Sequence, residues 1–212
     1  MANAILIGCT GLVGNELLTQ LLLDNSFDHV TVLVRKPLAF THPKLQERVV
    51  DFQNEAEFEG AMEGGDVIFS AVGTTQKKVK GDAAAYRSVD FWIPTKAAEF
   101  GKKWGARCFL LVSAVGADAH SKNFYLKLKG EVEMEVIKSG IPSIYLFQPS
   151  LLLGQRKEFR LGERLAQGIF PLIQWMFPKS YQGIQAKDLA KAMIRFSKQQ
   201  ENGYHPLTFK DF

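Results

Sequence analysis

Three side chains in the second half of the sequence could carry acid–base chemistry together: Ser113, Tyr125 and Lys129. Tyr125 and Lys129 are four residues apart in the segment NFYLKLKGEVE, so on a helix they share one face, whereas Lys127 points roughly 200° away. An ammonium group beside a tyrosine stabilises the phenolate that remains when the tyrosine gives up its proton, as a general acid must. The same spacing also fits an exposed aromatic–cation pair on a solvated helix, so the rest of the chain must decide.

The elements around these residues alternate between strand and helix patterns. Short apolar, β-branched runs predict strands, and segments with apolar residues at helical spacing separate them. The predicted strands are residues 3–8, 29–35, 48–52, 66–73, 107–116 and 143–154, and the predicted helices are 12–24, 82–103, 121–139 and 186–199. Strands that are apolar on both faces and alternate with helices are typical of a parallel sheet covered on both sides. We therefore predict an α/β fold with a Rossmann-type doubly wound parallel sheet.

The length of 212 residues predicts one domain over residues 1–212. After residue 154 the alternation ends, and residues 155–212 are expected to form a small C-terminal substrate or lid region packed on that domain. Aromatic residues in this region are expected to pack in the core or the lid, although a helix that binds a membrane surface or a partner is an alternative. These aromatic residues are Phe159, Phe170, Trp175 and Phe177.

A glycine-rich loop follows the first predicted strand, with Gly8, Gly11 and Gly14 spaced by three residues. The first glycine permits a tight turn, the second lets the backbone approach a pyrophosphate, and the third lets the helix pack closely on the strand. The helix N-terminus then offers N–H groups to the phosphates. An ordinary tight turn could carry the same glycines, but their place between the first strand and first helix favours a dinucleotide site. The predicted cofactor-binding residues in this loop are Gly8, Thr10, Gly11, Leu12, Val13 and Gly14.

The end of the second predicted strand indicates which dinucleotide the site prefers. An NAD-binding site usually has Asp or Glu there for the ribose hydroxyls, whereas this strand continues into Arg35 and Lys36. A guanidinium group suits the 2′-phosphate of NADP(H) because it can form bidentate, charge-assisted hydrogen bonds. A solvated strand end is the alternative interpretation of Arg35. We predict NADP(H) in preference to NAD(H).

Later strand ends extend the predicted cofactor site. Asp51 could accept a hydrogen bond from the adenine amine, with Phe52 beside the ring, although Asp also often opens a loop. Small residues after the fourth strand would let the backbone lie against the adenosine: Ala71, Val72 and Gly73. Ser113 ends the fifth strand at the carboxyl edge, where open α/β sheets bind ligands.

These motifs resemble the short-chain dehydrogenase/reductases of the extended or atypical kind. More narrowly, GTT, VSAVGAD and YLKLKGEVE are similar to segments of the small Tat-interacting-protein-like oxidoreductases. The resemblance implies that Tyr125 is the acid/base, that Lys129 also holds the nicotinamide ribose, and that Ser113 positions the substrate oxygen. Many members of the family have an asparagine in the fourth helix, near the place where this sequence has Asp90.

The resemblance also bears on the turn after the sixth strand, FQPS. In similar proteins this turn lies beside the nicotinamide, so it implies cofactor contacts for Gln148, Pro149 and Ser150. A proline that merely ends the strand is the alternative.

The leading functional hypothesis is an NADP(H)-dependent oxidoreductase of the short-chain dehydrogenase/reductase type that transfers hydride to or from a small carbonyl or alcohol. The first alternative is a noncatalytic NADP(H)-binding regulatory or interaction protein, because related atypical members have such roles. A nucleotide-sugar epimerase or dehydratase is less well supported, since the region after residue 150 leaves little room for a large sugar-nucleotide lobe. A small-molecule substrate is the expected partner, and the sequence does not distinguish a monomer from a dimer.

Composition limits the other functional classes. The net charge of +4 comes with no dense block of Lys and Arg, so nucleic acid is not an expected partner. The run Lys77, Lys78 and Lys80 is interpreted as a solvated loop, which a nearby phosphate ligand would also permit. Ser113 lacks a G-x-S-x-G elbow, so a serine hydrolase is not indicated.

Metal, membrane and compartment signals are weak. The four histidines are scattered, so no metal site is expected. They are His29, His42, His120 and His205. The apolar segment 165–177 is too short to cross a bilayer, and the N-terminal residues do not resemble a signal peptide. With only two cysteines, these observations make a cytoplasmic protein the default expectation.

Overall fold

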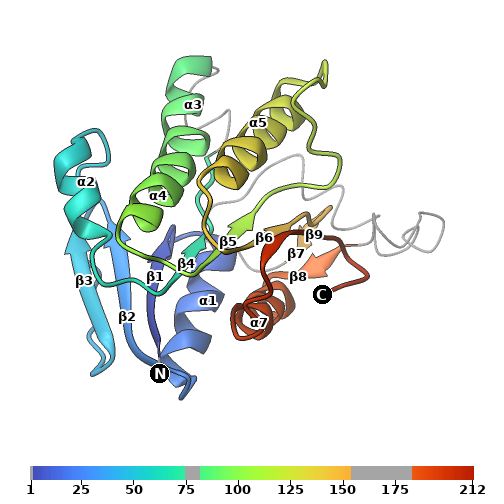
Figure 1. Cartoon of the computed structure of the whole chain (residues 1–212). Coiled ribbons are helices and arrows are strands. Elements are labelled where there is room, and N and C mark those ends of the chain that lie inside the picture. The colour runs from blue at the N-terminus through green and yellow to red at the C-terminus, as the bar shows by residue number, and fades with distance from the viewer. Residues whose placement is uncertain (1, 75–81, 154–182) are drawn as a thin grey trace.

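The described part of the chain forms a seven-stranded sheet whose neighbouring strands are all parallel (Figure 1). The computed structural model describes residues 2–74, 82–153 and 183–212. The strand order is β3-β2-β1-β4-β5-β6-β9. The strands are β1 (Ala2–Ile7), β2 (Phe27–Val34), β3 (Leu45–Val49), β4 (Val67–Ser70), β5 (Cys108–Val112), β6 (Ser143–Phe147) and β9 (Gly203–Leu207). A separate parallel pair joins β7 (Leu152–Leu153) to β8 (Ile184–Gln185).

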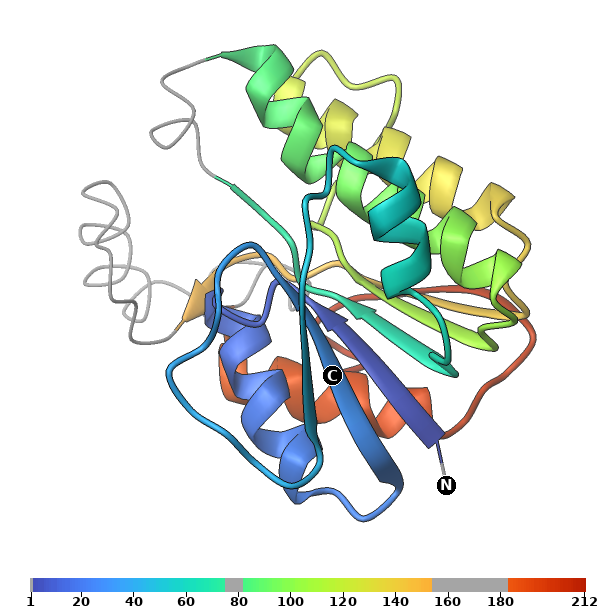
Figure 2. The same ribbon diagram turned by 90° about the vertical axis from the view of Figure 1, so that its left-hand side faces the viewer.

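Helices cover both faces of the sheet, which confirms the predicted Rossmann-type doubly wound fold (Figures 1 and 2). On one face lie α1 (Leu12–Leu23) and α7 (Ala186–Ser197), and on the other lie α2 (Glu55–Ala61), α3 (Ala83–Asp90), α4 (Trp92–Lys103) and α5 (Phe124–Lys138). Alternate residues of each strand face opposite layers. Leu6 and Phe69 therefore join the core under α1 and α7, whereas Ile5 and Ile68 join the core under the other helices.

Several elements differ from the sequence-based expectations, among them α2, which was not predicted. The third strand is Leu45–Val49, which leaves Asp51 and Phe52 in the loop before α2. The predicted helix 82–103 is two helices that meet at Phe91, because Pro94 has no N–H to donate to the carbonyl of Asp90. The seventh strand, β9, pairs with β6 and was not predicted.

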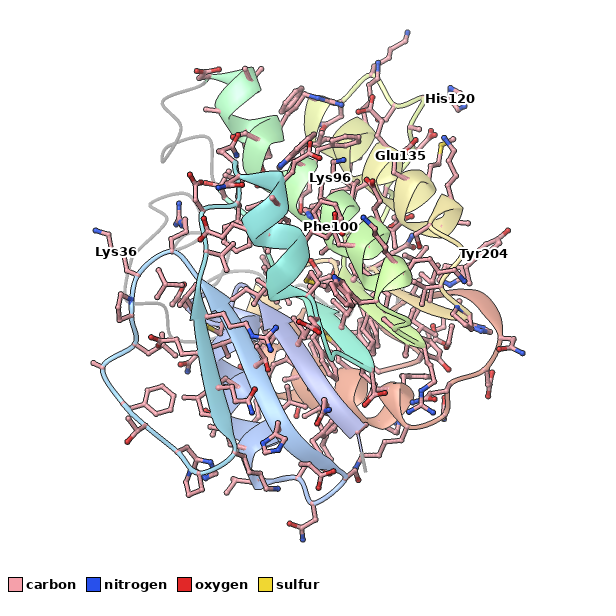
Figure 3. All side chains as sticks on the ribbon, turned by 60° about the vertical axis from the view of Figure 1, so that its left-hand side comes forward. Lys36, Lys96, Phe100, His120, Glu135 and Tyr204 are labelled. Atoms are coloured by element: carbon pink, nitrogen blue, oxygen red, sulfur yellow. The ribbon has the colours of Figure 1, made fainter. Side chains whose placement is uncertain are left out.

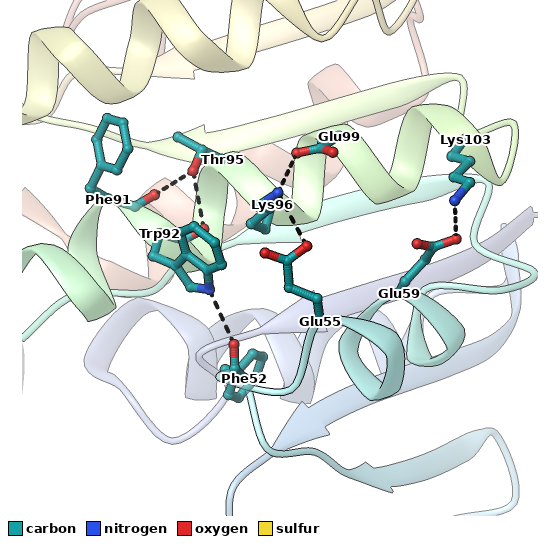
Figure 4. Close-up of polar contacts among 9 residues, drawn as sticks. All are labelled: Phe52, Glu55, Glu59, Phe91, Trp92, Thr95, Lys96, Glu99 and Lys103. Atoms are coloured by element: carbon teal, nitrogen blue, oxygen red, sulfur yellow. Dashed lines mark hydrogen bonds and ion pairs between the residues drawn. The ribbon is translucent and has the colours of Figure 1, made fainter.

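Helix α2 is held against α4 by polar contacts that also fix the loop after β3 (Figure 4). Trp92 Nε1 donates a hydrogen bond to the carbonyl oxygen of Phe52 at 3.2 Å. Lys96 Nζ lies 3.5 Å from Glu55 and 2.9 Å from Glu99. Ion pairs with exposed carboxylates contribute little singly, so the partly buried indole and its hydrogen bond are the main link.

Other expectations concern parts of the chain that the structure covers incompletely. The lysine run at 77–80 and the aromatic residues at 159–177 lie outside the described residues. Within the described ranges, no helix is both long enough and apolar enough to span a membrane. The same residues contain no group of three or more His, Cys, Asp or Glu side chains that could hold a metal ion.

Candidate functional site

The glycine loop after β1 touches the chain after β4, where the strand order reverses. Gly8 has φ of +89°, and a Cβ on it would lie 2.7 Å from the carbonyl carbon and oxygen of Ala71 and 2.9 Å from the nitrogen of Val72. Only glycine fits this close approach. Because ligands bind in open α/β sheets at such a switch point, the loop and residues 71–73 are the candidate wall of a dinucleotide site.

The N-terminus of α1 lies at the end of the same glycine loop. A Cβ on Gly14 would overlap the carbonyl of Gly8, so Gly14 lets the helix begin directly against the turn. No side chain caps the helix at Gly11, and its first turn has no acidic residue. The side chain of Val13 is buried in the core, so it is the backbone N–H groups of this turn that are available to an anion. The loop from Gly8 to Gly14 together with the first turn of α1, here called the glycine cradle, suits a pyrophosphate.

Two basic residues follow β2 at the same edge of the sheet. Ile7 pairs with Leu33, so Arg35 lies at the level of the glycine loop. Arg35 and Lys36 are both exposed, and Figure 3 shows Lys36 extending from the loop after β2. Neither side chain is committed to a described ion pair, and both remain proposed contacts for the ribose phosphate.

The two residues proposed for the adenine differ in their surroundings. Asp51 is exposed, and its Oδ1 accepts a hydrogen bond from the backbone of Gln53 at 2.9 Å. Phe52 is buried, with its ring 4.9 Å from the ring of Phe58 in an edge-to-face contact. Phe52 is therefore already a core residue, and of these two residues only Asp51 has an exposed side chain.

Tyr125 and Lys129 share one face of α5, as their spacing predicts. Asn123 caps the helix by accepting hydrogen bonds from the N–H groups of Tyr125 and Leu126 at 2.9 and 3.1 Å. Lys129 Nζ lies 5.9 Å from the centroid of the Tyr125 ring. Tyr125 is 39% exposed, whereas Lys129 is buried and Lys127 is exposed. The phenol thus faces solvent with an ammonium beneath it, an arrangement suited to proton transfer.

Asp90 provides the second contact of this lysine. Its Oδ1 lies 3.7 Å from Lys129 Nζ, and its Oδ2 accepts a hydrogen bond from the backbone of Thr74 at 2.7 Å. Asp90 is 2% exposed, and Lys129 5%. The carboxylate therefore links α5 to the chain segment that follows β4, immediately after Gly73.

Ser113 and Gln148 directly follow the adjacent strands β5 and β6. The N–H of Ser113 donates to the carbonyl of Phe147 at 2.7 Å, and the N–H of Val115 donates to the carbonyl of Pro149 at 3.0 Å. Among the described residues, the buried hydroxyl of Ser113 makes no hydrogen bond of standard geometry. A buried polar group without a partner is costly, so this hydroxyl is available to a ligand.

A buried carboxylate completes this group and was not predicted. Glu133 lies one turn after Lys129, and both its oxygens accept from Gln148 Nε2, at 3.0 and 3.1 Å. Burial raises the pKa of Glu133 above its ordinary value, and this effect exceeds the opposing influence of the nearby Ser113, Gln148 and Lys129. The helical spacing 125, 129 and 133 could have indicated it.

Gly130 sets the distance between α5 and the loop after β5. A Cβ on Gly130 would overlap the backbone of Asp118 and Ala119, and the N–H of Asp118 donates to the carbonyl of Leu126 at 3.1 Å. This contact brings the helix that carries Tyr125 close to the strand that ends before Ser113. The sequence signal, a glycine within a helix, is ambiguous without the structure.

Two other features do not add to the site. Burial raises the pKa of Cys9, in the glycine loop, to about 11, so it is a thiol rather than a thiolate nucleophile. A groove between α4 and α5 contains several lysines, but each is already bound to the protein. Lys102 donates to the carbonyl of Gly140, whereas Lys96, Lys103 and Lys138 pair with glutamates.

The switch-point glycine loop and the parallel sheet define a protein of the dinucleotide-binding Rossmann class. A family model described as NAD(P)H-binding matches residues 8–168. The chain belongs to this NAD(P)H-binding family.

Individual relatives agree with this assignment. Protein HTATIP2 from Rattus norvegicus is 36% identical over 195 residues, which cover 91% of this chain and 79% of the relative. Protein FMP52, mitochondrial, from Candida albicans is 30% identical over 210 residues, covering 95% and 90%. The structure titled "MoeE5 in complex with UDP-glucose and NAD" matches with a TM-score of 0.73 at 14% identity, over 97% of this chain and 75% of that one, which shows a shared fold.

The relatives overturn the expectation of a cytoplasmic protein. Several of them, from different fungi, carry names that describe them as mitochondrial. The cytoplasmic default depended on the lack of a recognisable targeting pattern, and such a lack does not identify a compartment.

Proposed function

We propose that this protein is an NADP(H)-dependent oxidoreductase of the short-chain dehydrogenase/reductase type. Bound nicotinamide would supply or accept a hydride, and the other substrate would be a small carbonyl compound or alcohol. Tyr125 would donate the proton to the carbonyl oxygen on reduction and remove it on oxidation. Lys129 would stabilise the phenolate and hold the nicotinamide ribose, and Ser113 would orient the substrate oxygen.

The observation that carries this proposal is the pairing of Tyr125 and Lys129. The lysine is buried, and its ammonium lies under the ring of a tyrosine that solvent can reach. A solvated aromatic–cation pair would expose both side chains. The buried hydroxyl of Ser113 has no hydrogen bond of standard geometry, and it supports the same site because a substrate oxygen could accept a hydrogen bond from it.

The cofactor preference depends on Arg35. Its exposed position after β2, at the level of the glycine loop, supports a contact with the 2′-phosphate of NADP(H). Lys36 would add a second positive charge near the same phosphate. The glycine cradle would bind the pyrophosphate of either dinucleotide, so the selectivity would come from these two residues.

Titration of the purified protein with NADPH and NADH tests the binding part of the proposal. Turnover assays with a panel of aldehydes, ketones and alcohols, in the presence of the bound cofactor, test the catalytic part. We expect tighter binding of NADPH and turnover of at least one class of carbonyl compound. Equal affinity for both cofactors would contradict the assigned role of Arg35.

One observation favours a second candidate, a noncatalytic NADP(H)-binding regulatory protein. The Asp90 carboxylate lies 3.7 Å from the Lys129 ammonium and offsets the charge that would stabilise a phenolate. If the protein is such a regulator, NADPH should bind tightly and no compound in the panel should be turned over. The same two assays therefore separate the candidates.

A further inference from the structure

Glu133 is a buried acid whose nearest partner is neutral. It projects from α5 toward the ends of β5 and β6, on the face that carries Tyr125 and Lys129. Its two carboxylate oxygens accept from the same amide nitrogen of Gln148. No described ion pair includes Glu133. A buried carboxylate whose immediate partners are neutral, here the amide of Gln148 and the nearby hydroxyl of Ser113, is poorly compensated when it is ionised.

The charged groups around Glu133 can be assigned element by element. On α5, Lys129 is one turn away and favours the ionised carboxylate, but its ion pair is with Asp90 of α3. The neighbouring strand ends present the neutral side chains of Ser113 and Gln148. Within the described residues, Lys129 is thus the one cation next to two buried carboxylates. A further positive charge would stabilise the ionised form of Glu133.

The proposed nicotinamide position supplies such a charge, because the ring is cationic when oxidised and neutral when reduced. We propose that Glu133 is a proton-exchange residue that holds its proton with the reduced cofactor and releases it to solvent when the oxidised cofactor binds. This inference depends on the proposed function, since it requires a nicotinamide at the turn that contains Gln148. Glu133 acts here through charge and position and takes no part in hydride transfer.

Two physical features support the exchange. The raised pKa of Glu133, caused mainly by burial, means that the proton stays on the carboxyl to a higher pH than on an ordinary glutamate. Electrostatic interactions are stronger in a buried site than in water, so a single added charge can displace this proton. The exchange makes the affinity for the oxidised cofactor depend on pH more steeply than the affinity for the reduced one.

Calorimetric titration in buffers of different ionisation enthalpy measures protons released on binding. We expect NADP⁺ to release a larger fraction of a proton than NADPH does, between about pH 5 and 8. The ratio of the two affinities should change by up to about tenfold per pH unit in favour of NADP⁺ as pH rises. In Glu133→Gln, which retains an oxygen that accepts from Gln148, this difference should largely disappear.

Glu131→Gln is the matched control, because Glu131 lies on the same helix but pairs with Arg87 at 2.6 Å, outside the site. It should keep the wild-type difference in proton release. Equal proton release by the two cofactors, or a difference that survives in Glu133→Gln, would overturn the inference while leaving cofactor binding intact. If neither cofactor binds, the proposed function fails, and the inference fails with it.

Discussion

Asp90 Oδ1 lies 3.7 Å from Lys129 Nζ, and both side chains are almost completely buried. This ion pair connects the helix that carries Tyr125 to the backbone at Thr74, close to the glycine loop. The two halves of the proposed site, one for the cofactor and one for proton transfer, are therefore joined by a charged contact.

The buried pair makes a prediction about stability. Asp90→Asn or Lys129→Met alone leaves a buried charge without its partner, so each should lower the free energy of unfolding by roughly 3 kcal/mol. The double variant should lose clearly less than the sum of the two. Urea denaturation of the four proteins measures this coupling, and strictly additive losses would show that the pair contributes nothing.

The close packing at Gly130 makes a second prediction. Gly130→Ala would force a methyl group onto the backbone of Asp118 and Ala119. We expect this variant to lower the free energy of unfolding by about 1–3 kcal/mol. Gly60→Ala is the matched control, because Gly60 also lies in a helix but a Cβ there meets nothing within 4 Å. That variant should raise the free energy of unfolding by about 0.5–1 kcal/mol, because alanine is favoured over glycine within a helix. Urea denaturation measures both variants, and similar changes in the free energy of unfolding would refute the proposed role of Gly130.

The third prediction concerns pH and the free protein. The folded pKa of Glu133 is raised by burial, so its contribution to stability is present at low pH and is lost as pH rises through that pKa. Glu133→Gln should therefore become progressively more stable relative to the wild type as pH rises from about 4. Denaturation series at several pH values measure this trend, and a difference that does not depend on pH would contradict it.

Local patterns were sufficient to predict the sheet, the glycine loop and the shared face of Tyr125 and Lys129. These features depend on periods of two and 3.6 residues and on glycine at a turn, which neighbouring residues specify. Sequence patterns predict secondary structure less well where contacts between distant segments determine it. The strand β9, GYHPL, is an edge strand that tolerates Pro206 and has no alternating apolar pattern, so it was missed.

Local sequence patterns also could not predict the polar contacts around the site. Asp90 could be placed near the site by resemblance, but its contacts with Lys129 and Thr74 depend on how α3 packs against α5 and the chain after β4. In the sequence, Glu133 is one more charged residue on a helix that could be solvated. Only the folded structure shows that its side chain contacts Gln148. Phe52, expected beside a ligand, lies instead in the core with Phe58.

Cofactor selectivity makes a fourth prediction. Arg35→Ala should weaken NADPH binding by about 10- to 100-fold, because it removes charge-assisted hydrogen bonds to the 2′-phosphate, and should change NADH binding little. Arg107→Ala is the control, since Arg107 is an exposed arginine just before β5, at the opposite end of the strand from Ser113. Fluorescence titration checks both variants. An equal loss for both cofactors would contradict the selectivity.

The most direct test of the central claim is the turnover rate of Tyr125→Phe with bound NADPH and the best carbonyl compound of the panel. The account predicts a fall of about 10²- to 10⁴-fold with unchanged cofactor affinity, because the variant loses only the proton donor. Tyr204→Phe removes the hydroxyl of an exposed tyrosine on β9 and should turn over like the wild type. Wild-type turnover in Tyr125→Phe would contradict the assignment of Tyr125 as the general acid.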